Sequence, residues 1–229
     1  MRPSTAATAT FAKAPNAIVM QGSAAAGRKP AMFALGTTQI LAKDEEIFAE
    51  GDSACHFYKV VAGTIRTYKL MSDGRRQIDA FHLPGDIFGI EIGDEHRFSA
   101  DAVEQATIIA YRRAPLEAVT RQNPAFGDEV LNSMIRSLER AQDHMLLLGR
   151  KTAQEKIATF LLDLAERMHE DDRFELPMQR TDIADYLGLT IETVSRTLTQ
   201  FARDGLIKLA ASSRNVVLAD RTALQRLNA

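Results

Sequence analysis

The sequence predicts an α+β fold in three consecutive parts: an all-β domain, one long helix, and a C-terminal domain of short helices with a β-hairpin. Glycines spaced eleven or twelve residues apart in the N-terminal half are typical of strands separated by turns. Apolar residues spaced alternately three and four apart after Pro124 predict a helix. Residues 180–196 have the pattern of two short helices around a sharp turn. We therefore expect a β-domain over residues 34–123, a long helix over 124–149 and a helical domain over 150–229.

Residues 1–33 precede the first predicted strand and are expected to form a disordered tail. They are rich in alanine, threonine and serine, and no acidic residue occurs before Asp44. A transit peptide has a similar composition, so that alternative stays open at this point.

The composition limits the class of protein. A chain of 229 residues is long enough for one or two domains with an ample core. The net charge of −2 does not by itself indicate a nucleic-acid-binding protein. A single cysteine, Cys55, excludes an internal disulfide and fits a reducing compartment. Because the sequence has neither an apolar run of membrane-spanning length nor a signal-peptide core, we expect a cytoplasmic protein with no membrane partner.

The predicted β-domain contains several strand-like runs joined by turn residues. The glycines that separate the runs are Gly51, Gly63, Gly74 and Gly85. The expected strands include residues 56–62, 64–70, 77–83 and 103–112. The Asp73-Gly74 pair favours a tight hairpin turn between the second and third of these strands. Strands of this length and spacing predict a sandwich or a barrel.

The long helix carries a narrow apolar seam with heptad spacing. Its members are Leu131, Met134, Leu138, Ala141, Met145 and Leu148. A seam of this kind is typical of a helix that packs against another helix, so we expect it to form a homodimer interface. The alternative is a single amphipathic helix packed on its own β-domain. Val130 and Ile135 indicate that one flank does pack there, so we expect both contacts.

The C-terminal segment has the residue types that a helix-turn-helix requires. Ala184 is small enough to face a crossing helix, and Gly188 accepts the positive φ of a sharp turn. Thr190 is a good N-cap for the second helix. The expected buried faces of the two helices contain Ile183, Leu187, Leu189, Val194 and Leu198. On spacing alone, an ordinary helical hairpin is the alternative.

The elements around this pair complete the domain. Residues 153–168 have one apolar face and predict a helix, followed by a charged loop over 169–173. Residues 206–209 and 215–218 are strand-like and flank the polar segment 210–214. This arrangement predicts a hairpin, which would make the domain a winged helix-turn-helix.

The second helix of the pair exposes side chains that suit base recognition. Arg196 can donate two hydrogen bonds to guanine, Glu192 can accept one from cytosine N4, and Ser195 can contact several bases. We therefore expect this helix to read double-stranded DNA. The expected contacts to the DNA backbone come from Thr181, Thr190, Thr193, Arg203, Lys208 and Arg214. For each basic residue of that set, a solvated surface position is the alternative.

The stretch Glu192-Thr193-Val194-Ser195-Arg196 resembles the E-x-x-S-R recognition signature of the CRP/FNR family of bacterial transcription regulators. The preceding residues 182–190 are most similar to the FNR and FixK branch, and the resemblance extends from Phe33 to the C-terminus. It implies a β-roll of the cyclic-nucleotide-binding jelly-roll type, a dimerisation helix and a winged helix-turn-helix domain. It also implies TTGAT-type half-sites, RNA polymerase as a partner of the wing, and target genes for low-oxygen respiration and nitrogen fixation.

The family's usual ligand sets are incomplete in this chain. The N-terminal cysteines of FNR are absent, and Cys55 alone cannot hold a four-thiolate iron–sulfur cluster. Phe98 stands where a cyclic-nucleotide-binding member has its phosphate-binding arginine. If Arg97 lies in a strand, it points to the opposite face. We therefore expect no cofactor and no cyclic nucleotide, and DNA binding that needs no small ligand.

The main alternative is a sensor of the same family, gated by haem, nitric oxide or a metabolite in the β-roll. A haem-binding member would use a histidine, for which His82 is the first candidate, although a strand residue partly in solvent is the simpler interpretation. Cys55 is a candidate redox switch. An enzyme is not expected, because the sequence shows no nucleophile–base pair, metal triad or phosphate-binding loop.

Overall fold

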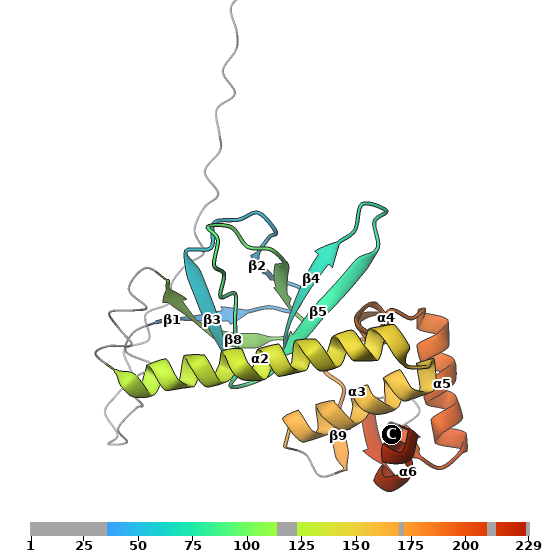
Figure 1. Cartoon of the computed structure of the whole chain (residues 1–229). Helices are drawn as coiled ribbons and strands as arrows, with labels where there is room; N and C mark the ends of the chain where they lie inside the picture. The colour runs from blue at the N-terminus through green and yellow to red at the C-terminus, as the bar shows by residue number, and fades with distance from the viewer. Residues whose placement is uncertain (1–35, 114–122, 170–171, 210–213, 228–229) are drawn as a thin grey trace, which may run out of the picture.

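The computed structural model describes residues 36–113, 123–169, 172–209 and 214–227. The tail expected over residues 1–33 and the tip of the predicted hairpin, residues 210–213, lie outside them. Figure 1 shows the long helix α2 lying along the β-domain, with the C-terminal helices gathered near the end of α2 and next to strands β4 and β5. The α+β fold class predicted from the sequence is confirmed.

The β-domain is a jelly-roll-like pair of four-stranded antiparallel sheets, in the strand orders β1-β8-β3-β6 and β2-β7-β4-β5. The strands are β1 (Thr37–Leu41), β2 (Glu46–Phe48), β3 (His56–Ala62), β4 (Ile65–Leu70), β5 (Arg76–His82), β6 (Ile87–Phe88), β7 (Ser99–Ala102) and β8 (Ala106–Arg112). The predicted strands 56–62, 64–70, 77–83 and 103–112 correspond to β3, β4, β5 and β8. The four regularly spaced glycines all have positive φ, between 77° and 96°, which explains why the turns occur there.

Helix α2 (Pro124–Arg150) is capped at its N-terminus by Asn123 and packs one flank on the β-domain. Phe126 and Val130 are buried against Phe57 and Tyr111 of that domain. The expectation that Ile135 also packs there was wrong, because its side chain is 46% exposed. Residues five positions apart on an α-helix are separated by about 140° around its axis, so Val130 and Ile135 cannot share one face.

A neighbouring face of α2, about a quarter turn around the helix axis from Phe126 and Val130, is apolar and exposed in the single chain. The exposed fractions are 56% for Leu131, 48% for Met134, 60% for Leu138 and 66% for Met145. Ala141 is also exposed, and Leu148 is half-buried. Monomers rarely expose a contiguous apolar surface of this kind without a partner for it.

The C-terminal domain contains four helices and a small sheet within the described residues. The helices are α3 (Ala153–Arg167), α4 (Arg180–Leu187), α5 (Ile191–Arg203) and α6 (Arg221–Leu227), and the strands are β9 (Arg173–Glu175), β10 (Ile207–Leu209) and β11 (Asn215–Leu218). The predicted strands 206–209 and 215–218 correspond to β10 and β11. The predicted loop over 169–173 was wrong at its end, because Arg173 begins β9, which pairs with β11 and makes the sheet three-stranded.

The β-domain and the C-terminal domain share one hydrophobic core. Ile78 and Phe81 of β5 belong to the same buried cluster as residues of α3, α4 and α5. The ring of Phe81 lies 5.3 Å from that of Tyr186 and 6.3 Å from that of Phe160 between centroids. The contact between the domains is therefore a packed interface. No helix among the described residues combines the length and the apolar character needed to cross a bilayer.

Candidate nucleic-acid interface

Helices α4 and α5 are joined by a turn whose geometry follows from two residues. Gly188 adopts a left-handed conformation, with φ 61° and ψ 42°, and ends α4. The Thr190 side chain begins α5 by accepting a hydrogen bond of 3.2 Å from the backbone N–H of Thr193. Both features match the expectation from the sequence, since glycine tolerates positive φ and threonine satisfies a free helix N–H.

The two helices are fixed to each other by buried side chains. Ala184, Leu187, Val194 and Leu198 are each at most 4% exposed. The ammonium group of Lys156, on α3, donates a hydrogen bond of 3.0 Å to the carbonyl of Leu187 at the end of α4. This buried lysine was not identified from the sequence, where it resembles a solvated helix position. It satisfies one of the carbonyl groups that a helix end leaves without an intrahelical partner.

The face of α5 that lies away from this core carries the three candidate base-reading residues. Glu192, Ser195 and Arg196 are three and four positions apart, so they lie on one side of the helix. Glu192 and Arg196 are exposed, and Ser195 is half-buried. In the part of the chain that the structure describes, neither Glu192 nor Arg196 forms an intramolecular ion pair. Their charged groups are therefore available to an external partner.

Most of the candidate backbone contacts also lie at the surface of these elements. Thr181 is exposed in the first turn of α4, Arg203 in the last turn of α5, and Lys208 on β10. The hydroxyl groups of Thr190 and Thr193 lie 3.0 Å apart at the start of α5. Hydroxyl groups, ammonium groups and helix N-termini are the groups that bind phosphate oxygens in DNA complexes.

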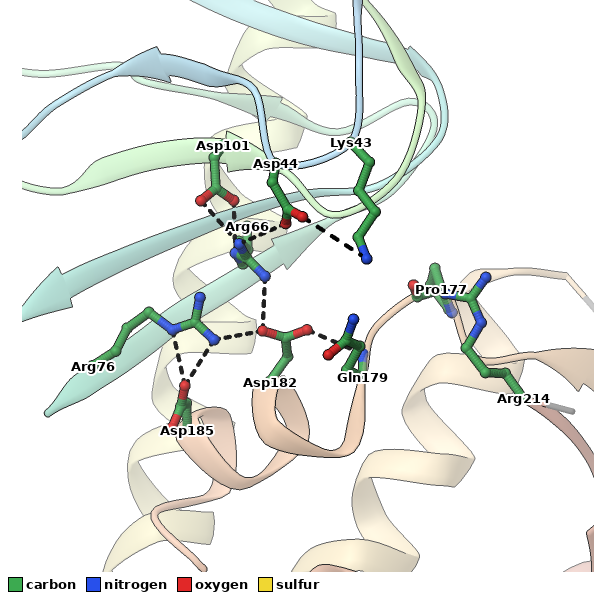
Figure 2. A network of polar contacts seen from close by, with 10 residues as sticks. All are labelled: Lys43, Asp44, Arg66, Arg76, Asp101, Pro177, Gln179, Asp182, Asp185 and Arg214. Carbon is green, nitrogen blue, oxygen red and sulfur yellow. Dashed lines mark hydrogen bonds and ion pairs between the residues drawn. The ribbon is translucent and has the colours of Figure 1, made fainter. Parts of the chain in front are cut away.

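Arg214 differs from the other candidates because its guanidinium group already contacts the protein. It donates a hydrogen bond of 2.7 Å to the carbonyl of Pro177, which lies next to it in Figure 2, and is 3.2 Å from the Glu175 carboxylate. These contacts fix the base of the hairpin next to β9. A contact to DNA phosphate would therefore compete with Glu175.

The β-domain contains a cavity of about 300 Å³. Asp79, Glu91, Arg97 and Phe98 are among the residues that line it. The expectation that Arg97 points away from this space was wrong. Strand β7 begins only at Ser99, so the alternation of a strand does not apply to the two preceding residues.

His82 also lines this cavity, but its side chain is buried and already contacts other side chains of the protein. Its side chain is buried, its Nε2 atom lies 3.0 Å from the hydroxyl oxygen of Thr67, and its ring stacks on that of Phe88. The interpretation of His82 as a strand residue partly in solvent was therefore wrong. Burial lowers the pKa of His82 from 6.5 to about 4, against the opposing effect of the Asp86 carboxylate.

We expect the buried state of His82 to reduce stability in mild acid. Between about pH 6.5 and pH 4 the unfolded chain binds the proton that folded His82 excludes, so the free energy of unfolding falls as the pH decreases. The contribution of His82 should be about 2 kcal/mol between pH 7 and pH 5. Urea unfolding of the wild type and of His82→Gln at both pH values measures it. Equal pH dependence in the two proteins would contradict the assignment.

Cys55 lies at the surface of the β-domain, immediately before β3. It is exposed, and its Sγ atom lies 3.1 Å from the hydroxyl oxygen of Ser53. Its redox role stays a prediction. Within the described residues, no group of three or more histidine, cysteine, aspartate or glutamate side chains could hold a metal ion.

Two family models match the chain. A Crp-like helix-turn-helix domain matches residues 155–227, and a cyclic nucleotide-binding domain matches residues 38–123. The first match covers the candidate nucleic-acid interface, and the second covers the β-domain with its cavity.

Relatives of known type match over most of their length. The nitrogen fixation regulation protein FixK of Azorhizobium caulinodans is 50% identical over 200 residues, which are 85% of this chain and 80% of the relative. The transcriptional activator protein Anr of Pseudomonas protegens is 37% identical, over 79% of this chain and 75% of the relative. The solved structure of FixK2 from Bradyrhizobium japonicum has a TM-score of 0.79 and 45% identity, and the match covers 85% of this chain and 98% of that one. The names of the first two relatives are those of transcription regulators, not of enzymes.

Proposed function

Because the chain belongs to the CRP/FNR family of transcription regulators, with FixK proteins among its relatives, we propose that it binds palindromic DNA sites as a homodimer and needs no small ligand to do so. The proposed site has two TTGAT-like half-sites in the arrangement TTGAT-N4-ATCAA. The observation that carries this proposal is the exposed face of α5, where Glu192 and Arg196 have no competing ion pair within the described residues. In the proposed complex, Arg196 binds a guanine, Glu192 a cytosine, and Ser195 the neighbouring base pair.

The proposal of a homodimer is supported by the exposed seam of α2. Leu131, Met134, Leu138 and Met145 are all about half exposed or more in the single chain. Packing against the same seam of a second copy would bury them and relate the two chains by a two-fold axis. Such a dimer presents two recognition helices to half-sites about one DNA turn apart, ~34 Å between centres.

The proposal of ligand-independent binding is supported by the charges in the β-domain cavity. Two carboxylates, those of Asp79 and Glu91, line it together with the single arginine Arg97. The carboxylates disfavour an anionic ligand such as a cyclic nucleotide, because like charges repel strongly where water is partly excluded.

The target genes follow from the names of the relatives. FixK proteins of three organisms are named as regulators of nitrogen fixation, and Anr and AadR as transcriptional activators. We therefore propose that this chain activates genes for nitrogen fixation. The resemblance to the FNR and FixK branch extends this proposal to genes for low-oxygen respiration. RNA polymerase is the proposed protein partner, and the segment between β10 and β11, part of which lies outside the described residues, is the proposed contact.

Binding of the protein, purified without added ligand, to a TTGAT-N4-ATCAA duplex tests this function. We expect its dissociation constant at physiological salt to be at least about 1000-fold lower than for a scrambled duplex of equal length. Fluorescence anisotropy at several salt concentrations measures both constants, because the phosphate contacts alone are salt-dependent. Equal affinity for the two duplexes would refute sequence-specific binding at this site.

A second candidate function is a ligand-gated regulator of the same family. The observation that favours it is the presence of both Arg97 and Glu91 in the cavity, since one could bind a phosphate and the other a hydroxyl group. Micromolar binding of cyclic AMP by titration calorimetry, with tighter DNA binding in its presence, would support this candidate over ligand-independent binding. A haem absorbance band in protein from iron-fed cells would support haem gating instead.

A further inference from the structure

A cluster of charged side chains joins the β-domain to the first helix of the helix-turn-helix, as Figure 2 shows. We call it the interdomain cluster, and its members are Arg66, Arg76, Asp101, Asp182 and Asp185. The two arginines lie on β4 and β5, Asp101 lies on β7, and the other two aspartates lie on α4. The arginines and the aspartates of α4 are more than 100 positions apart in the sequence, so no local pattern indicates their pairing.

Arg66 lies at the centre of the interdomain cluster and is 7% exposed. Its Nε atom lies 2.6 Å from Asp101 Oδ1, and its Nη2 donates a hydrogen bond of 3.0 Å to Asp101 Oδ2. Its Nη1 donates a hydrogen bond of 2.7 Å to Asp182 Oδ1. One guanidinium group therefore binds a carboxylate of each domain and fixes the distance between β7 and α4.

Arg76 approaches the same helix from β5. Its Nη2 lies 2.6 Å from Asp182 Oδ1, and its Nε donates a hydrogen bond of 2.9 Å to Asp185 Oδ2. The second oxygen of Asp182 accepts the backbone N–H of Gln179 at 3.0 Å, at the start of α4. The Asp182 carboxylate therefore has two roles: it pairs with both arginines, and it caps the N-terminus of α4.

The apolar part of the interface and the interdomain cluster have different physical roles. Contacts such as that of Phe81 with Tyr186 hold the domains together, but hydrophobic attraction has no direction and tolerates small rotations. A forked guanidinium group binds carboxylates only in narrow geometries. Buried ion pairs contribute little net stability, because desolvation offsets their attraction, and their better-attested role is to select one arrangement.

We propose that Arg66 and Arg76 are positioning residues for DNA recognition, which orient the recognition helix α5 by holding α4 through Asp182 and Asp185. The inference rests on the proposed function, because it concerns the geometry of palindrome binding. Helix α4 packs directly on α5 through buried side chains, so its orientation sets that of α5. If the recognition helices vary in orientation, a smaller fraction of the dimers has both helices at the separation that the two half-sites require. The apparent affinity for the palindromic site falls in proportion to that fraction.

The charge exchange at residues 76 and 185 tests the proposal. We expect Arg76→Glu to weaken binding to TTGAT-N4-ATCAA by roughly tenfold, a usual size for coupling between sites. Its preference for the N4 spacer over N3 and N5 spacers should also fall. The double variant Arg76→Glu/Asp185→Arg should recover both. Arg75→Glu is the matched control, because Arg75 is exposed and pairs with Asp73 inside the hairpin between β4 and β5.

A second measurement separates failure of this proposal from failure of the proposed function. Spin labels at Gln200→Cys, in a Cys55→Ser background, report the distance between the two α5 helices of a DNA-free dimer. We expect one narrow distance distribution in the parent, a broad one in Arg76→Glu, and a narrow one again in the double variant. Arg76→Gln replaces Arg76→Glu if the latter does not fold. The proposal would be overturned if folded, dimeric Arg76→Glu kept both the distance distribution and the spacer preference of the parent. It would also be overturned if Arg76→Glu bound DNA more tightly, because the contacts of Arg76 with α4 would then inhibit binding.

Discussion

Replacing Leu138 with aspartate is expected to separate the dimer and to weaken binding to the palindromic duplex by about 100-fold or more. Leu138 lies in the middle of the α2 seam and is 60% exposed in the single chain. In the proposed dimer, the substitution occurs twice at one point of the interface and removes two buried apolar side chains. The expected loss of association free energy is on the order of 4 kcal/mol, which raises the dimer dissociation constant about 1000-fold. A monomer then contacts one half-site and loses the advantage of simultaneous binding.

Sedimentation velocity at micromolar concentration measures the association state, and anisotropy measures DNA affinity. Asn132→Asp is the matched control, because it adds the same carboxylate to the exposed surface of α2 outside the seam. It should leave a dimer that binds as the wild type does. If Leu138→Asp stayed dimeric, the proposed interface would be wrong. If the wild type itself sedimented as a monomer, dimeric recognition would be wrong as well.

The parts of the fold that depend on local chemistry could be predicted from the sequence. The turn glycines, the Thr190 cap and the Gly188 helix end each satisfy a requirement of one or two residues, so they are visible in a single chain. Strand β9 was missed because it has three residues and exists through pairing with β11, about 40 positions later. A strand of that length has no periodicity to detect.

The predictions that failed at the cavity and at the domain interface depend on tertiary contacts, which the local sequence does not show. Arg97 was placed on the wrong side because the prediction assumed that it lies in a strand, whereas β7 begins only at Ser99 and strand alternation does not apply before it. His82 is buried by elements that pack on β5, which its neighbours in sequence do not reveal. The partners of Arg66 and Arg76 lie on a helix over 100 residues away. A charged strand residue is usually solvated, so neither arginine was distinguishable from a surface position.

Replacing Arg196 with alanine is expected to remove most of the sequence specificity of DNA binding. The side chain is exposed on α5 and has no intramolecular ion pair in the described part of the chain. A bidentate contact to guanine is worth about 1–3 kcal/mol, and the dimer makes it twice. The affinity for TTGAT-N4-ATCAA should therefore fall at least tenfold, and about thirty-fold if each half-site loses 1 kcal/mol. The affinity for random duplex should change much less, because it depends on phosphate contacts.

Two further variants determine whether Arg196 acts through its shape or only through its charge. Arg196→Lys keeps the positive charge but loses the forked donor geometry, so it should bind random DNA as the wild type does and still lose specific binding. Arg203→Ala removes an exposed cation at the end of α5, where a phosphate contact is proposed. It should weaken binding to specific and random duplexes by the same factor and reduce the salt dependence of both. If Arg196→Ala behaved like Arg203→Ala, Arg196 would be a phosphate contact, and a different residue of α5 would read the guanine.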